Sequence, residues 1–365
     1  MLITIMASKQ ITKKASRQCF ILVVAAMALI SGCAAQGAKR VPRDRFDYNA
    51  ALAQSTREQM LLNIIKVRYL DLPIFLDVGQ LVTSYSLESS VNLGGTLTSA
   101  GGIGTLGTQG RYTDRPTITY MPMTGEKFLA GFLTPIPPLN VFALVQSGYE
   151  ADFILELCLD SFNGLFNRPS SIASRRQPDP EFFHVLSLMR EVQDAGAFGM
   201  RLEQPEGRDY AIVFFFRDHN VSEEIKAKAA EVRRLLDVET NQMQFEMVYS
   251  PMHGGPGKLG VGTRSLLQML QALSLGISIP EAHSQLELIP PMMEISENEN
   301  ALLRVHSGPK KPDNGFVAVP YEDQWFWIAQ NDWKSKNTFS SILFLFTLSD
   351  SGGKENLPTI TIPTY

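Results

Sequence analysis

The sequence predicts a mixed α+β protein. We expect an N-terminal helical region with a long amphipathic β-hairpin, a central hairpin–helix–strand unit, and a C-terminal small sheet plus an apolar helix. Apolar residues recur at helical spacing in several segments, and they alternate with polar residues over a long stretch between residues 80 and 121. A hydrophobic content of 44% and a charged content of 19% are those of a folded globular protein.

The 365 residues are enough for two or three domains of ordinary size. Residues 169–179 contain two prolines and several serines, which is the composition of a linker. We therefore expect a lipoprotein signal peptide (1–32), a tether (33–45), a helical domain with the amphipathic hairpin (46–170), an α+β domain (180–285) and C-terminal strands with a helix (286–365).

The start of the chain has the three parts of a secretory signal. Basic residues come first, an uncharged apolar run covers residues 20–30, and the run ends in Ile30-Ser31-Gly32-Cys33. This ending matches the bacterial lipobox, which predicts cleavage between Gly32 and Cys33. The Cys33 thiol would then carry diacylglycerol, and the new amino terminus would carry a fatty acid such as palmitate. The alternative is an uncleaved anchor helix, for which the apolar run is too short.

The lipid and the following residue predict the location. Two or three acyl chains, at ~0.8 kcal/mol per buried methylene, hold a protein on a membrane almost permanently. Ala34 follows the cysteine, where aspartate would favour the inner membrane, so we expect an outer-membrane lipoprotein that faces the periplasm. The net charge of −4 includes the basic signal, so the mature chain is acidic and nucleic acid is not an expected partner.

The cysteines exclude a disulfide within the mature chain. Cys19 leaves with the signal and Cys33 carries lipid, so Cys158 has no cysteine to pair with. We expect it to be a small buried apolar residue.

The first helix is expected to begin at a capping box formed by Ser55 and Glu58. Its apolar stripe consists of Met60, Leu61, Ile64 and Ile65. Pro73 would end the helix, and residues 74–76 would start a buried strand.

Residues 80–121 form the candidate membrane or partner hairpin. Its first strand has apolar residues on alternate positions: Tyr85, Leu87, Val91, Leu93 and Leu97. We expect a glycine-rich loop over residues 101–110 and a second strand over residues 117–121. One apolar face and one small-polar face are typical of a membrane β-hairpin. An ordinary sheet of a soluble domain is the alternative.

The rest of the chain shows alternating helical and strand patterns. We expect helices over residues 138–148, 151–162, 179–194, 222–236, 263–275 and 338–348. We expect strands over residues 200–204, 210–217, 243–249, 302–306, 316–319, 324–329 and 359–362.

Three blocks of this sequence are distinctive: residues 61–78, 116–138 and 316–346. They resemble a family of uncharacterised lipoproteins of Gram-negative bacteria. The resemblance implies a surface location. It supplies no catalytic or ligand-binding residue.

Several motifs resemble known sites but lack their context. Residues 255–260 fit G-x-G-x-x-G, but Pro256 interrupts the turn and the expected helix starts only near residue 263. Residues 307–310 fit S-x-x-K, yet Gly-Pro between the serine and the lysine indicates a turn. The histidines are isolated, so we expect no metal and no cofactor.

Two groups of side chains are candidate ligand-binding residues. Asp152, Glu156 and Asp160 recur every four residues, which would put three carboxylates on one helix face, and a pair of them could act in glycosidic cleavage. A solvated helix face is the favoured interpretation. Trp325 and Trp327, followed by Trp333, form a candidate aromatic ligand face for a sugar or lipid. On a strand, Phe326 would point to the opposite face and into the core.

These observations favour a lipid-anchored envelope protein that is not an enzyme. It would act in assembly, as a homo-oligomer or as a component of an envelope complex. The hairpins of sister subunits would join in the membrane or pack on a partner. The alternative is a periplasmic glycan-binding or hydrolytic protein. A third possibility is an adaptor for a secretion machine, built on residues 198–250.

Overall fold

The computed structural model describes residues 36–82, 85–98, 101–114, 117–170, 176–203, 211–217, 219–239, 241–289 and 301–349. The chain divides into two compact units, residues 1–57 and 58–365. The signal peptide, the cleavage position at Gly32 and Cys33, and the strand expected at 359–362 lie outside the described residues. The fold is mixed α+β, as the sequence predicted.

Helix α2 (Gln36–Arg68) belongs to both units and corrects the expected helix start. Ser55 and Glu58 lie inside the helix, and the segment expected to be a tether is helical from Gln36 onward. The residues directly before Ser55, from Ala50 to Gln54, are good helix formers, so the helix continues through the capping pattern although Pro42 lies within it. The expected apolar stripe from Met60 to Ile65 is buried.

Two amides of α2 hold the segment that follows it. The Asn63 amide donates to the Ile74 carbonyl and accepts from the Ile74 N–H, both at 2.8 Å. The Gln59 amide does the same at Leu76, at 3.2 and 2.8 Å. These amides occupy the backbone groups that a strand would use, so strand β1 (Leu76–Val82) starts later than expected. Within the expected strand 74–76, only Phe75 is buried.

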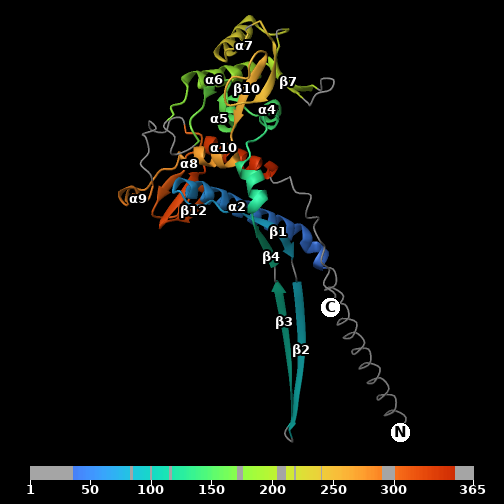
Figure 1. The fold of residues 1–365 in the computed structure, drawn as a ribbon. Coiled ribbons are helices and arrows are strands. Elements are labelled where there is room, and N and C mark those ends of the chain that lie inside the picture. The colour runs from blue at the N-terminus through green and yellow to red at the C-terminus, as the bar shows by residue number, and fades with distance from the viewer. Residues whose placement is uncertain are drawn as a thin grey trace, which may run out of the picture. The chain divides into compact units, whose positions relative to one another are not determined.

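Four strands form a pair of two-stranded ladders. Strand β1 pairs with β4 (Thr117–Pro122), and β2 (Tyr85–Thr98) pairs with β3 (Gly101–Asp114), both antiparallel. Figure 1 shows β2 and β3 side by side along their whole length. The expected glycine-rich loop is therefore wrong, because these residues form β3. Glycine is disfavoured in strands but does not prevent pairing.

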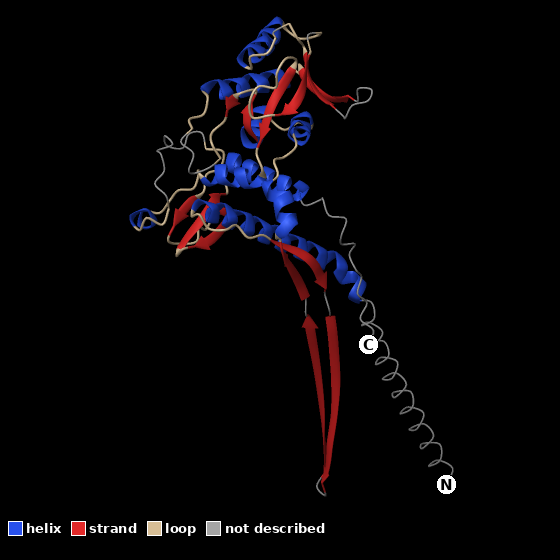
Figure 2. Ribbon diagram, viewed as in Figure 1, coloured by secondary structure: helices blue, strands red, loops and turns tan. Residues whose placement is uncertain are grey.

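A six-stranded sheet forms the centre of the second unit (Figures 1 and 2). In spatial order its strands are β6 (Leu165–Phe166), β5 (Leu159–Phe162), β10 (Lys258–Thr263), β9 (Gln244–Tyr249), β8 (Ala211–Phe216) and β7 (Phe198–Glu203). Only the β10–β9 pair is parallel. The sheet combines strands from both sides of the linker expected at residues 169–179. Strands β7, β8 and β9, together with helix α7 (Glu223–Leu235), match the expected hairpin–helix–strand unit.

The helices of this unit agree well with the sequence pattern. They are α4 (Pro138–Gln146), α5 (Ala151–Cys158), α6 (Pro180–Asp194), α7 (Glu223–Leu235) and α8 (Leu266–Ser274). The helix expected over 151–162 is too long, because residues 159–162 form β5. The helix expected over 263–275 starts later, after a capping box of Ser265 and Gln268. On α4, the Phe142 ring lies 6.2 Å from Phe162 and 5.8 Å from Phe214, which packs this helix against the sheet.

Two short helical segments lie between β4 and α4, and a third follows α8. They are α3 (Gly125–Phe128), the π-helix η1 (Leu129–Leu133) and α9 (Glu281–Gln285). A three-stranded sheet follows in the order β11 (His306–Gly308), β13 (Gln324–Ala329) and β12 (Gly315–Tyr321). The strand expected at 302–306 is displaced, because Val305 makes an isolated bridge with Ile277.

Helix α10 (Trp333–Ser349) packs against residues from the first half of the chain. It starts earlier than the expected residue 338, because Asp332 accepts a hydrogen bond from the Ser335 N–H at 3.1 Å and caps it. Near its end, the Phe346 ring lies 5.1 Å from Phe75 and 5.5 Å from Phe132. The core at the base of β1 and β4 is thus completed by a residue near the C-terminus.

A second contact of this kind involves the end of α2. The Tyr69 hydroxyl hydrogen-bonds His283 Nδ1 at 2.7 Å, and the Tyr69 ring packs edge-on against Tyr321 and Phe326. The other imidazole nitrogen of His283 lies 3.0 Å from the Glu322 carbonyl oxygen. These contacts pack the C-terminal sheet against residues that follow the first helix.

Cys158 is fully buried, as expected for the structural cysteine. Burial raises the pKa of its thiol to about 12. At pH 8 the reactive thiolate is therefore about one molecule in 10⁴. We predict that maleimide does not modify Cys158 in the native protein, whereas it modifies the denatured protein within minutes. Peptide mass spectrometry measures both, and rapid native labelling would show that α5 opens readily.

Candidate functional site

The register of the β2–β3 hairpin shows which of its positions share a face. Pairing runs without a shift from Tyr85 opposite Asp114 to Thr98 opposite Gly101. Residues directly opposite each other in an antiparallel ladder lie on the same face, and neighbours along a strand lie on opposite faces.

One face of the hairpin holds all of its apolar positions except Ile103, together with Ser89, Thr108, Asp114 and glycines. The five residues expected to form it, from Tyr85 to Leu97, occupy alternate positions of β2. Tyr112 is opposite Leu87, and Leu106 is opposite Leu93. The other apolar positions of this face are Tyr85, Val91 and Leu97.

The other face consists of polar positions and glycine, with Ile103 as the exception. Glu88 is opposite Arg111, and Ser90 is opposite Gln109. No charged residue occurs between Glu88 and Arg111, so the distal part of the hairpin is uncharged on both faces. The ribbon is therefore amphipathic in both of its strands.

Strand β3 was missed because glycines separate its informative residues. Leu106 and Tyr112 stand on even positions, while Thr105, Gln109 and Arg111 stand on odd ones. Ile103 on an odd position and Asp114 on an even one break this alternation, so the period-two signal is weaker here than in β2.

From Gln80 to Val82, β1 pairs with β4 in the register that β2 and β3 continue, and one shift in register precedes this stretch. The shift lies between Val78 and Gln80, so Gly79 is the extra residue of a bulge. A Cβ at Gly79 would lie 2.5 Å from Cε of Met121. We call strands β1, β2, β3 and β4 together the arm. Within the described residues each of these strands has a single partner strand, so each has one edge outside its ladder.

The second feature is a cavity of about 540 Å³ between α5, the start of α6 and the start of α10. Its polar lining includes Glu150, Asp152, Glu156, Arg168, Arg304, Asp332, Lys334 and Asn337. Its aromatic lining is Phe153, Phe183 and Trp333.

Most carboxylates of this cavity have partners within the chain. Arg168 Nη1 lies 2.5 Å from Glu156 Oε1, and its guanidinium lies 4.6 Å from the centre of the Phe183 ring. Burial raises the pKa of Glu156, although Arg168 and Arg264 oppose that shift. Asp332 accepts hydrogen bonds from the Ser335 N–H and hydroxyl.

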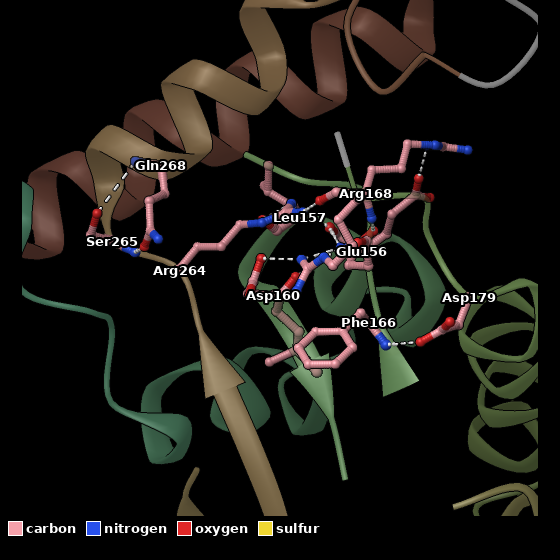
Figure 3. Close-up of polar contacts among 12 residues, drawn as sticks. Glu156, Leu157, Asp160, Phe166, Arg168, Asp179, Arg264, Ser265 and Gln268 are labelled. Atoms are coloured by element: carbon pink, nitrogen blue, oxygen red, sulfur yellow. Dashed lines mark hydrogen bonds and ion pairs between the residues drawn. The ribbon is translucent and has the colours of Figure 1, made fainter. Parts of the chain in front are cut away.

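Next to this cavity, Arg264 donates hydrogen bonds to backbone carbonyls at the end of α5 and in the loop after β6 (Figure 3). The guanidinium is 1% exposed. Its Nη1 donates to the carbonyls of Glu156 and Leu157 at 3.0 and 3.2 Å, and Nη2 donates to the Arg168 carbonyl at 2.5 Å. Burial lowers the pKa of Arg264 to about 10, so it remains charged at neutral pH. Sequence reasoning missed Arg264, because an isolated arginine carries no motif.

Of the three carboxylates expected on one helix face, only two lie on the same helix. Asp152 and Glu156 share α5 and line the cavity, whereas Asp160 lies in β5 and pairs with Arg176 at 3.2 Å. The helix ends before Asp160, which removes it from the row. Glu156 is not a fully solvated residue either, because its side chain is 21% exposed and ion-paired.

The candidate aromatic face is on β13. Phe326 is fully buried, and Trp325 and Trp327 are half-buried, which is the expected alternation. The Trp327 ring lies 5.8 Å from His306, and Lys311 Nζ lies 5.3 Å from the Trp325 ring. Neither tryptophan lines the large cavity, whereas Trp333, which is 67% exposed, does.

The two sequence motifs have structural roles. Gly255 and Gly257 have φ of 91° and 69° in the turn between β9 and β10, and Gly260 lies in β10. A Cβ at Gly260 would lie 2.0 Å from the Met252 carbonyl oxygen, so only glycine fits there. A strand follows these glycines, where a dinucleotide site has a helix. Ser307 lies in β11, not at a helix start.

Across the described ranges, no group of three potential ligands could hold a metal ion. In that same part of the chain, none of the helices combines the length and apolar character needed to cross a membrane. Comparison with protein-family models, curated proteins and solved structures finds no match.

Two buried arginines provide a matched stability test. Arg68 is also 1% exposed, but its Nε and Nη1 have no hydrogen-bond partner among the described residues, and burial lowers its pKa. We predict that Arg264→Met lowers the free energy of unfolding by about 3 kcal/mol or more, because three carbonyls lose their donor. Arg68→Met should leave it unchanged or raise it by about 1 kcal/mol, because an uncompensated charge is removed.

Chemical denaturation of the full chain in detergent, followed by tryptophan fluorescence, measures both values. Equal destabilisation by the two substitutions would show that the hydrogen bonds of Arg264 do not distinguish it from Arg68.

Proposed function

We propose that this protein is a lipid-anchored outer-membrane lipoprotein, not an enzyme, that acts by assembly through its β2–β3 hairpin. The observation that carries the proposal is the register of the hairpin, which gathers the apolar positions except Ile103 on one face and leaves an edge on each strand outside the ladder. The lipobox at Cys33 supports the anchor.

Unpaired strand edges favour addition of another strand. An isolated two-stranded hairpin is marginally stable in water, and its edge N–H and C=O groups are a template for another strand. Strand β3 of one copy can add to β2 of the next in the antiparallel sense, because β2 and β3 run in opposite directions. Repetition of this contact is head-to-tail, and it leaves no free edge once the ring closes.

The same geometry suits a lipid environment. In a closed ring every hairpin would direct its apolar face outward and its polar face inward, which satisfies the backbone groups that lipid cannot hydrogen-bond. A tilted strand needs about 9–11 residues to cross the hydrocarbon core. Strands β2 and β3 have 14 residues each.

The first experiment compares two double variants of equal charge on opposite faces at the same depth. Val91→Asp/Leu93→Asp places carboxylates on the apolar face, and Ser90→Asp/Asn92→Asp places them on the polar face. We predict that the apolar-face variant loses the oligomer, because charged residues on the lipid-facing side of a strand are destabilising. The polar-face variant should keep it.

Size-exclusion chromatography with light scattering on detergent-extracted full-length protein measures the assembly. Cleavage by trypsin after Arg111 in intact membranes reports whether the hairpin is shielded. A strictly monomeric wild type with rapid cleavage at Arg111 would overturn the proposal, and so would equal effects of the two double variants.

A separate experiment tests the anchor. We predict that the mature wild-type chain begins at Cys33 with thiol and amino-terminal acylation, and that Cys33→Ser keeps the leader and carries no lipid. Mass spectrometry of the N-terminal peptide from membranes measures both. An unmodified Cys33 in the wild type would contradict the envelope location.

A further inference from the structure

The cavity beside α5 has a wall of mixed charge in which the charges are largely compensated. Arg190 lies 3.1 Å from Glu150 and 4.0 Å from Asp152, and Arg168 pairs with Glu156. Opposite them, Asp332 accepts from Ser335. A strongly anionic or cationic ligand would therefore meet both signs of charge, so net attraction to an ion is weak.

The hydrogen-bonding capacity of the same wall is nevertheless incomplete. Each carboxylate offers about four lone-pair positions, and the intramolecular contacts use only part of them. The side chains of Asp152 and Glu156 are 46% and 21% exposed, so part of each carboxylate is open to a ligand. Arginine and lysine only donate, whereas ionised carboxylates only accept. A ligand that satisfies both kinds of group must donate and accept, as a hydroxyl does.

Trp333 adds an apolar surface to this polar wall. It is the first residue of α10 and is 67% exposed. Its position follows from the Asp332 cap, which fixes the start of the helix at the edge of the cavity. Aromatic rings with a few convergent polar groups are typical of small-molecule sites, and a volume of about 540 Å³ lies in the range of such pockets.

From these features we infer that the cavity between α5 and α10 binds a neutral oligosaccharide. The hydroxyls of the sugar donate to Asp152 and Glu156 and accept from the cationic side chains, and one ring face lies on Trp333. This inference is independent of the proposed assembly, because no residue of the hairpin lines the cavity. It differs from the aromatic face expected at Trp325 and Trp327, because these residues lie elsewhere.

The test is a binding measurement on the full-length protein in detergent. The neutral probes are maltohexaose and chitotetraose, and the charged controls are oligogalacturonate and spermine. We expect saturable binding of at least one neutral probe by isothermal titration calorimetry, and at least tenfold weaker binding of the charged controls.

Two single substitutions then test whether the sugar binds in this cavity. Trp333→Ala should weaken binding of the neutral probe at least tenfold with unchanged thermal unfolding, because this side chain is largely exposed. Trp325→Ala is the matched control and should leave binding unchanged. Absence of binding by both neutral probes at 10 mM (about −2.7 kcal/mol) would overturn the inference. Tighter binding of a charged control, or equal loss in Trp325→Ala, would overturn it as well.

Discussion

Incomplete backbone hydrogen bonding along the β2–β3 ribbon is the constraint on which the interpretation of this molecule depends. Each strand has 14 residues and a single partner strand within the described structure. Most strands of this length are covered by further strands, because an exposed edge promotes association. The amphipathic pattern adds a second constraint, since every copy would have to direct its apolar face the same way.

Outside the hairpin, several side chains make hydrogen bonds with backbone groups that no neighbouring strand pairs. The Asn63 and Gln59 amides pair with Ile74 and Leu76 as a neighbouring strand would. Arg264 satisfies three carbonyls at the end of α5 and in the loop after β6. Asn163 accepts from the N–H groups of Gly254 and Gly260 and donates to the Leu236 carbonyl. Such single polar residues hold irregular segments where no ladder is possible.

Much of the fold could be predicted where local signals agree. Helix α4 has prolines at its start, four buried apolar residues at helical spacing, and Gly148 with a φ of 100° beyond its end. Helix α7 begins after the Ser222 cap, and Ala229 and Val232 on it are buried. Strand β5 was missed because its apolar residues continue the pattern of α5, and only tertiary pairing with β10 decides between helix and strand there.

The candidate cavity was less predictable, for a different reason. Its lining comes from residues near 150, 168, 183, 304 and 333, which no local pattern connects. Sequence reasoning identified Glu156 and Trp333 separately, as members of a carboxylate row and an aromatic group. Their common location depends on how α5 and α10 pack, which the order of residues alone does not reveal.

The stacking of Phe346 on Phe75 and Phe132 has a consequence for biogenesis. The chain is synthesised from its amino terminus, so the aromatic residues at the foot of the arm stay uncovered until almost all of the polypeptide has been made. The core at the base of β1 and β4 therefore gains its last packing contact late in the synthesis of the chain.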